Sequence, residues 1–319
     1  MIEAIASYLP ELIVSNEALA GTFANWTAEK IFQKTGIRER HIAAAGETVV
    51  DMAAHACRGL AESRDCGELA PDFILFCTQS PEQSLSSSAC LLQHRLNLPA
   101  STGALDIASG CSGYLYGLAG AHGLLTTGVA RRILFVTSET YSRLLHPEDA
   151  GCRTLFGDAA TATLLTADSG HQLSAFAFGT DGAGQQHLTV PNAGDEGQWQ
   201  FGPGCLHMDG PEVFAFTIAH VPETVHRVLT LAQIALEDVD YFVFHQANAF
   251  MLEHLRKKLG IPREKFILHL EHTGNTVSNT IPLALEHCIS RNLFEPGMKI
   301  MLVGFGVGLS WGGCMLDWR

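Results

Sequence analysis

Residues 72–79 read DFILFCTQ and residues 240–247 read DYFVFHQA, so an acidic residue opens the same kind of apolar run twice. Both runs are rich in β-branched and aromatic residues, as is typical of strands buried inside a sheet. The offset between them, from 72 to 240, is 168 residues. A second pair, RILFV at 132–136 and KIMLV at 299–303, has an offset of 167. Two nearly equal spacings indicate a duplicated ancestor, with halves at residues 1–170 and 171–319.

Helical stretches alternate with these strands. They are expected at residues 112–127, 213–236, 249–259 and 280–291. This alternation predicts an α/β fold with buried sheets. The stretch 112–127 holds a single histidine and no charged residue. A helix that is apolar on every face is predicted to lie buried at the centre of the molecule.

The composition excludes several classes of protein. The chain has 319 residues, 47% of them hydrophobic, and a formal net charge of −13, which disfavours nucleic acid because negative charge repels phosphates. No segment reaches the roughly 18–20 apolar residues that span a bilayer, and the N-terminus lacks the layout of a secretory signal. The nine cysteines are scattered without C-x-x-C or metal-ligand spacing. We therefore expect a cytoplasmic protein that binds no membrane and no metal.

Cys111 is the candidate nucleophile. It follows DIASG at residues 106–110 and precedes the apolar helix, so its thiol is expected at a strand-to-helix turn. The positive end of a helix favours a thiolate, and this placement predicts a lowered thiol pKa. A cysteine in a turn of small residues is, taken alone, more often a compact core residue. That plainer interpretation is the prediction for the other eight cysteines.

Two polar residues are candidate partners for Cys111. His245 ends the second apolar run, at the end of a strand where α/β sheets place their ligands. Taken alone, one histidine among 15 is more often structural. Asn275 lies in a polar turn before a helix, where the plainer interpretation is a cap formed by Asn279 or Thr280. The glycine run GFGVG at 304–308 follows a strand, and it can present a free backbone N–H or hold a phosphate.

Six motifs, taken in order, resemble the β-ketoacyl-acyl-carrier-protein synthase III family from end to end. They are TGIRERH at 35–41, Cys111 in its turn, FGD at 156–158, HQAN at 245–248, GNT at 274–276, and GFG at 304–306 with WG at 311–312. The resemblance implies the five-layered αβαβα thiolase fold, with the nucleophile in the half 1–170 and the catalytic histidine and asparagine in the half 171–319. It also implies a homodimer that uses no cofactor and no metal.

The resemblance further implies a decarboxylative Claisen condensation. Cys111 accepts an acyl group from coenzyme A or acyl carrier protein, while the backbone N–H groups of Cys111 and Gly306 hold the oxyanion. A malonyl thioester on acyl carrier protein, or a β-ketoacyl thioester, then attacks, with its enolate oxygen held by His245 Nε2 and the Asn275 amide. Phe305 is expected to line the site. The β-ketoacyl product would serve fatty-acid initiation or a specialised lipid or polyketide pathway.

The sequence departs from the family pattern where a coenzyme A primer binds. The family commonly stacks the adenine between a tryptophan and an arginine. Lys30 and Ala150 occupy those two positions in this chain, with Trp26 and Arg153 nearby. The departure favours a carrier protein or another acyl donor.

Two further positions bear on the partners of the enzyme. Phe250 stands where the family has an arginine that helps dock the acidic carrier protein, and Arg256, Lys257 and Lys258 remain as the predicted docking residues. Leu85 replaces the phenylalanine that often closes the primer pocket across the dimer. A smaller wall predicts a longer or bulkier acyl group than acetyl.

Three alternatives compete with a condensing enzyme. An acyltransferase of the same fold would pass the acyl group from Cys111 to an alcohol or amine, and Asn275 beside His245 argues against it. A non-catalytic subunit of a heterodimeric synthase should have lost one of the three groups, and all three are present. A thiolase needs a second catalytic cysteine near the C-terminus, for which Cys314 is the candidate. The acyl chain, its carrier and the pathway are left open.

Overall fold

Two β-sheets form the centre of the computed structural model, which describes residues 1–319 except 24, 64–68, 168, 196 and 198. The first sheet has the strand order β1-β7-β6-β4-β5, and the second has the order β11-β12-β13-β8. The first is built from β1 (Ile2–Tyr8), β4 (Phe73–Cys77), β5 (Gly103–Ile107), β6 (Arg132–Glu139) and β7 (Ala159–Thr166). The second is built from β8 (Gln172–Thr180), β11 (Tyr241–Phe244), β12 (Lys299–Gly306) and β13 (Ser310–Asp317).

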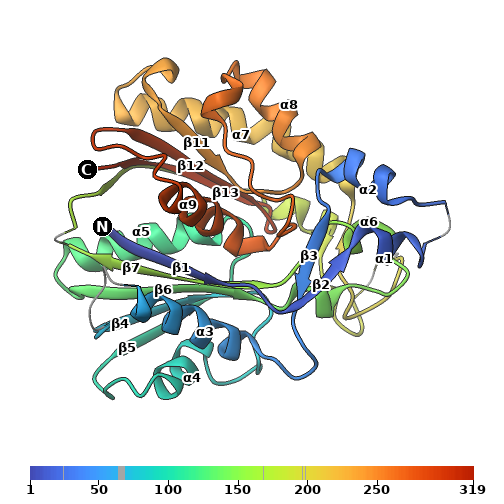
Figure 1. Cartoon of the computed structure of the whole chain (residues 1–319), viewed down its shortest axis with the longest axis horizontal. Helices are drawn as coiled ribbons and strands as arrows, with labels where there is room; N and C mark the ends of the chain where they lie inside the picture. Colours follow the sequence, from blue (N-terminus) through green and yellow to red (C-terminus); the bar gives the residue numbers. More distant parts are fainter. Residues whose placement is uncertain (24, 64–68, 168, 196, 198) are drawn as a thin grey trace.

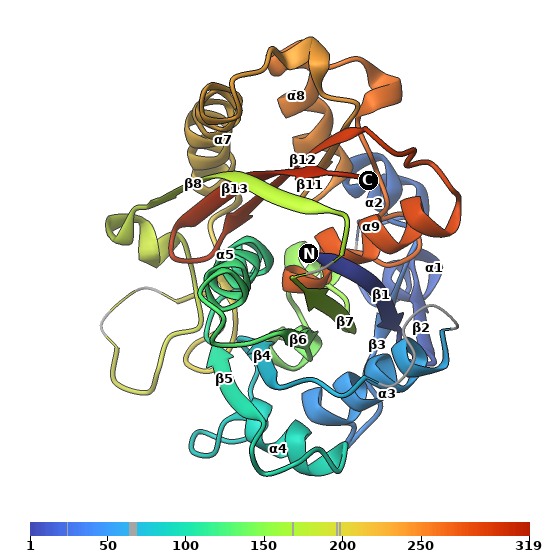
Figure 2. The same ribbon diagram turned by 90° about the vertical axis from the view of Figure 1, so that its left-hand side faces the viewer.

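Helices cover both sheets and fill the space between them, as Figure 2 shows. The helices α3 (Val49–Glu62) and α4 (Ser88–Arg95) lie on the outer face of the first sheet. The helices α5 (Gly113–Thr126) and α9 (Thr280–Ser290) lie between the sheets, and α7 (Gly210–Ala232) and α8 (Ala249–Leu259) cover the second sheet. These layers confirm the predicted five-layered αβαβα thiolase arrangement.

The two sequence repeats form the same pair of neighbouring strands in each sheet. β4 runs parallel to β6 with Phe73 opposite Ile133, and β11 runs parallel to β12 with Tyr241 opposite Ile300. Each residue of the second pair therefore lies 168 or 167 positions after its counterpart, as in the repeat. The strands of the first sheet end at residue 166 and those of the second begin at residue 172, and the division into halves at residues 170 and 171 stays a prediction.

The predicted helices form with small shifts at their ends. The uncharged stretch 112–127 becomes α5, which packs against strands of both sheets as predicted. The stretch 249–259 forms α8 with the predicted ends, and 280–291 forms α9, one residue shorter. The stretch predicted at 213–236 begins earlier, at Gly210, because the Asp209 side chain accepts a hydrogen bond from the backbone of Glu212 and caps the helix. It also ends earlier than predicted, at Ala232.

Smaller elements lie beside the sheets, and those formed by residues 12–42 and 150–153 gather at one end, on the right of Figure 1. The antiparallel pairs are β2 (Leu12–Ser15) with β3 (Glu39–Ile42) and β9 (Leu188–Thr189) with β10 (His207–Met208). The short helices are α1 (Asn16–Ala20), α2 (Ala28–Thr35), α6 (Ala150–Arg153) and the 3₁₀ turns η1 (Tyr141–Leu144), η2 (Gly182–His187), η3 (Leu236–Asp238), η4 (Arg263–Lys265) and η5 (Val277–Asn279). In the part of the chain that the structure describes, no helix is both long and apolar enough to cross a bilayer.

Candidate active site

Cys111 lies in the turn between β5 and α5, with 6% of its surface exposed. The glycines on either side leave no room for a side chain. A Cβ atom at Gly110 would lie 2.3 Å from Gln79 Oε1, and one at Gly113 would lie 2.4 Å from Cys77 Sγ. The small residues around Cys111 thus let neighbouring segments approach its thiol closely.

The protonation of Cys111 differs from the sequence-based prediction. Burial, followed by the charge of Glu139, raises the pKa of the Cys111 thiol to about 12, although the backbone N–H groups of Cys111 and Val307 act in the opposite direction. The helix end was expected to lower this pKa. The prediction was wrong because the cost of removing a thiolate from water exceeds the stabilisation from these backbone groups.

The glycine run at the end of β12 approaches the Cys111 thiol closely. A Cβ atom at Gly306 would lie 2.7 Å from Cys111 Cβ and 3.0 Å from Sγ. The backbone amides that hydrogen-bond to the thiol are those of Cys111 and Val307. Backbone N–H groups at this point are suited to an oxyanion, and the donor role of Gly306 stays a prediction.

His245 follows β11 and is buried, with 2% exposure. Its Nδ1 atom lies 2.7 Å from Thr280 Oγ1. The rings of His245 and Phe305 pack edge to face, with 5.3 Å between their centroids. Burial lowers the pKa of the His245 imidazole to about 3, so the ring is neutral at physiological pH. A neutral ring whose Nδ1 is already paired has Nε2 left for chemistry.

Asn275 is held by the backbone on both sides. Its N–H donates to Leu155 O at 2.9 Å, and its side-chain Oδ1 accepts from the N–H of Val277 at 2.9 Å. Because Oδ1 is used in this way, the Nδ2 group remains as the donor of the side chain. The preceding Gly274 has φ of 70°, and a Cβ there would lie 2.9 Å from Leu155 O. Only glycine fits that turn without strain.

One pocket brings the predicted catalytic residues together. Cys111, His245, Asn275 and Phe305 all line it. The remaining lining is mostly apolar: Leu155, Phe156, Leu188, Met208, Val213, Ala247, Asn248, Met251 and Gly306. Leu85 is not among these residues, and 85% of its surface is exposed. Within one chain, Leu85 therefore does not line the site.

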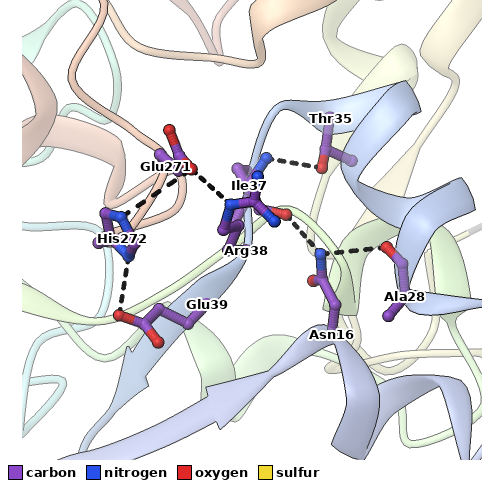
Figure 3. Close-up of polar contacts among 8 residues, drawn as sticks. All are labelled: Asn16, Ala28, Thr35, Ile37, Arg38, Glu39, Glu271 and His272. Atoms are coloured by element: carbon purple, nitrogen blue, oxygen red, sulfur yellow. Dashed lines mark hydrogen bonds and ion pairs between the residues drawn. The ribbon is translucent and has the colours of Figure 1, made fainter.

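The motif at residues 35–41 contacts Glu271 and His272, as Figure 3 shows. The Arg38 side chain pairs with Glu271 at 2.5 Å, and the Arg38 backbone N–H donates to Glu271 O at 2.7 Å. His272 Nδ1 lies 3.0 Å from a carboxylate oxygen of Glu39. Glu271 and His272 come shortly before Asn275 in the chain, so these contacts tie the motif to the segment that leads into Asn275.

Glu139 is a buried group that the sequence reasoning missed. Its carboxylate accepts from the backbone N–H of Gln79 and from the hydroxyls of Ser80, Thr78 and Ser278. Burial raises the pKa of Glu139 to about 7 despite these hydrogen bonds. The only signal was a charged residue at the end of an apolar strand. Glu139 joins the loop after β4 to the turn that follows Asn275.

The three predicted docking residues differ in their exposure and in their contacts within the chain. Arg256 is 15% exposed and holds both carboxylate oxygens of Glu253, at 2.9 and 2.6 Å, while Nη1 donates to Ile261 O. Arg256 thereby lowers the pKa of Glu253 to about 2. Lys258 donates to Ile218 O at 2.9 Å. Lys257 is exposed and 3.5 Å from Glu253, so it is the most available cation of the three.

Trp26 and Arg153, near the expected adenine site, each pack against another residue. Lys30 and Lys34 place their Nζ atoms 5.3 and 5.2 Å from the Trp26 ring centroid, and the Arg153 guanidinium lies 5.6 Å from the Phe23 centroid. Among the described residues, no cluster of three or more His, Cys, Asp or Glu side chains could hold a metal ion. Of the other eight cysteines, all predicted to be core residues, Cys90 is exposed, Cys205 is half-buried and Cys66 lies outside the described residues.

A cysteine, a histidine and an asparagine that line one pocket of a thiolase fold define a thiolase-fold condensing enzyme. Family models described as 3-oxoacyl-[acyl-carrier-protein] synthase III and its C-terminal region match residues 105–182 and 229–318. The chain belongs to this family. Its predicted family and its enzyme class, an acyltransferase, are confirmed.

Individual relatives agree with this assignment. A Streptomyces coelicolor protein named β-ketoacyl-[acyl-carrier-protein] synthase III 3 is 33% identical, with 100% of this chain and 97% of that protein covered. A β-ketoacyl-[acyl-carrier-protein] synthase III of Thermosynechococcus vestitus is 36% identical, with 95% and 92% covered. A solved structure of a 3-oxoacyl-(acyl-carrier-protein) synthase III is 47% identical, with a TM-score of 0.94 and 99% of both chains covered.

Proposed function

We propose that the enzyme joins an acyl group, carried on Cys111, to a malonyl thioester and releases carbon dioxide. In the first stage the Cys111 sulfur attacks the acyl carbonyl carbon, and the bond from that carbon to the donor's sulfur breaks. The proton of the Cys111 thiol ends on the departing sulfur. The N–H groups of Cys111 and Val307 stabilise the negative oxygen that forms during the attack.

In the second stage the malonyl carboxylate leaves as carbon dioxide, and its electron pair forms an enolate. His245 Nε2–H and Asn275 Nδ2–H donate to the enolate oxygen. The enolate carbon attacks the acyl carbonyl, the bond to Cys111 Sγ breaks, and the released thiolate takes one proton from solvent. No step requires a cofactor or a metal ion.

The observation that carries this proposal is that Cys111, His245 and Asn275 line the same buried pocket. An acyltransferase acting on alcohols or amines would have no use for two enolate donors, and a non-catalytic subunit would have no use for any of the three. Thiolase chemistry would need a second catalytic cysteine, for which Cys314 is the candidate. Cys314 is buried in β13 and does not line the pocket, so the site favours condensation over thiolase chemistry.

Intact-protein mass spectrometry tests the proposal. Wild type, Cys111→Ala and Cys90→Ala are incubated with acyl-coenzyme A and acyl-carrier-protein donors, and malonyl carrier protein is then added. Cys90 is exposed and serves as the control for non-specific acylation. We expect an acyl adduct on wild type and Cys90→Ala only, discharged with release of carbon dioxide. An adduct discharged only by alcohols or amines identifies an acyltransferase, and an adduct on Cys111→Ala contradicts the assignment of the nucleophile.

We propose acyl carrier protein as the partner that delivers the malonyl group. Lys257 on α8 is the candidate contact with its acidic surface, because Arg256 and Lys258 are engaged within the chain. Beside it, Phe250 is exposed and its ring centroid lies 5.8 Å from that of Phe214. An apolar contact at Phe250 would replace the arginine of the family pattern. The product would serve fatty-acid initiation or a specialised lipid or polyketide pathway.

We also propose a homodimer. β5 pairs with β4 on one side and forms the edge of the first sheet, where Leu105 is exposed. An open strand with an exposed leucine is suited to pairing with a second copy. Leu85, which precedes α4 and lies outside its own chain's site, would then reach the pocket of the partner. The cytoplasm is the proposed location, since unpaired cysteine spacing suits a reducing compartment.

A further inference from the structure

Thr280 lies directly behind the catalytic histidine. It is the first residue of α9 and is buried. Its hydroxyl oxygen lies 2.7 Å from His245 Nδ1 and 3.1 Å from Val277 O. The hydroxyl carries a single hydrogen, which it can give to only one of these two acceptors. The choice decides which nitrogen of His245 holds the proton of the neutral ring.

The surroundings favour donation to His245. Val277 O already accepts the backbone N–H of Thr280, so that carbonyl has a partner without the hydroxyl. The contact with Nδ1 is the shorter of the two, at a length usual for a hydrogen bond from a hydroxyl. In the opposite arrangement Nδ1 would hold the proton, and Nε2 would face the pocket as a bare acceptor.

We propose that Thr280 donates to Nδ1 and thereby keeps the ring proton of His245 on Nε2, where it points at the substrate. Thr280 is a positioning residue, because it acts through His245. This inference rests on the proposed function, in which Nε2–H must donate to the enolate oxygen. A neutral ring with its proton on Nδ1 has no hydrogen to offer there.

The same turn orients the second donor. The backbone N–H of Val277 donates to Asn275 Oδ1 at 2.9 Å, which leaves Asn275 Nδ2 for the substrate. Thr280 follows three residues later and holds Nδ1 of His245. The segment from residue 275 to residue 280 therefore turns both enolate donors toward the pocket, through one backbone amide and one hydroxyl.

The first test reads the position of the proton without measuring activity. Long-range ¹H–¹⁵N spectra of protein labelled with ¹⁵N-histidine distinguish the two neutral tautomers, and subtraction of the His245→Gln spectrum assigns the signals of His245. We expect the pattern of an Nε2–H ring at neutral pH in wild type. The pattern of an Nδ1–H ring would overturn the proposal, whatever the enzyme then proves to catalyse.

The second test separates the two stages of the reaction. Thr280→Val removes the hydroxyl at nearly constant volume, and Thr280→Ser keeps it. Acylation is followed as mass gain on Cys111. The malonyl step is followed as loss of that mass from desalted acyl-enzyme after malonyl carrier protein is added.

We expect Thr280→Val to slow the malonyl step about tenfold to a hundredfold and acylation less than about threefold, and Thr280→Ser to change neither by more than about threefold. An equal loss in both stages, no loss in the malonyl step, or a serine variant as slow as the valine variant would overturn the proposal. A wild-type enzyme that fails to discharge its acyl group with malonyl carrier protein contradicts the proposed function instead. If Thr280→Val does not fold, the spectra of wild type still decide the position of the proton.

Discussion

At the scale of single residues, burial controls the reactivity of the nucleophile. Because burial raises the pKa of the Cys111 thiol to about 12, the reactive thiolate is a small fraction at neutral pH and grows about tenfold with each unit of pH. We expect alkylation of Cys111 by iodoacetamide to accelerate continuously from about pH 7 to about pH 10, as followed by peptide mass spectrometry. A plateau near neutral pH would mean that the helix end lowers the pKa after all.

The residue scale also shows what a sequence can predict about a site. Cys111, His245 and Asn275 were predictable because each is a reactive side chain in a motif, and the structure places all three in one pocket. The Val307 donor was not predictable, because any residue of the glycine run offers the same backbone N–H. Thr280 looked like a helix cap, since its distance from His245 depends on how α9 packs against β11.

At the scale of elements, Glu139 at the end of β6 makes stability depend on pH. Its pKa in the folded protein, about 7, lies above the ordinary value of 4.5, so the folded state keeps a proton that the unfolded chain loses between these values. The unfolding free energy should therefore fall as pH rises through this window. Glu139→Gln cannot ionise and should lack that fall.

Urea unfolding of both proteins at about pH 5 and about pH 8 checks this expectation. The stability of Glu139→Gln relative to wild type should improve by about 1–3 kcal/mol at the higher pH. A difference that stays constant with pH would show that Glu139 is ionised throughout. The absolute effect of the substitution is a separate quantity, because glutamine also changes the hydrogen bonds to Gln79 and Ser278.

Helix α8 illustrates how neighbouring cations take different roles. Arg256 is fixed by Glu253 and Ile261 O, whereas Lys257 extends into solvent. We expect Lys257→Ala to raise KM for malonyl carrier protein about two- to fivefold without changing Tm, because an exposed charge contributes modestly to docking. Arg256→Ala should lower Tm and leave that KM nearly unchanged. The reverse pattern would make Arg256 the docking residue.

The ion pair between Glu253 and Arg256 was predictable from the sequence, because residues three positions apart lie on the same face of a helix.

At the scale of the whole molecule, the layers were predictable because the repeat and the uncharged helix are strong patterns. Two apolar runs with matching offsets became the parallel pairs β4–β6 and β11–β12, and α5 lies between the sheets. The path of the loops was less predictable. The pocket wall at Leu188 and Met208, for example, comes from the two-residue strands β9 and β10, which have no periodicity to detect.

The edge of the first sheet leads to the last prediction. Leu105 on β5 and Leu231 on α7 are each 53% exposed, but only Leu105 lies on an unpaired strand edge. A charge at the centre of a strand-to-strand interface would be buried without a partner, so Leu105→Asp should convert the dimer to a monomer, whereas Leu231→Asp should not. Size-exclusion chromatography with light scattering measures the masses. The monomer should also lose condensing activity, because each pocket would lack Leu85 of the second copy. A wild type that is already monomeric and active would refute the shared pocket.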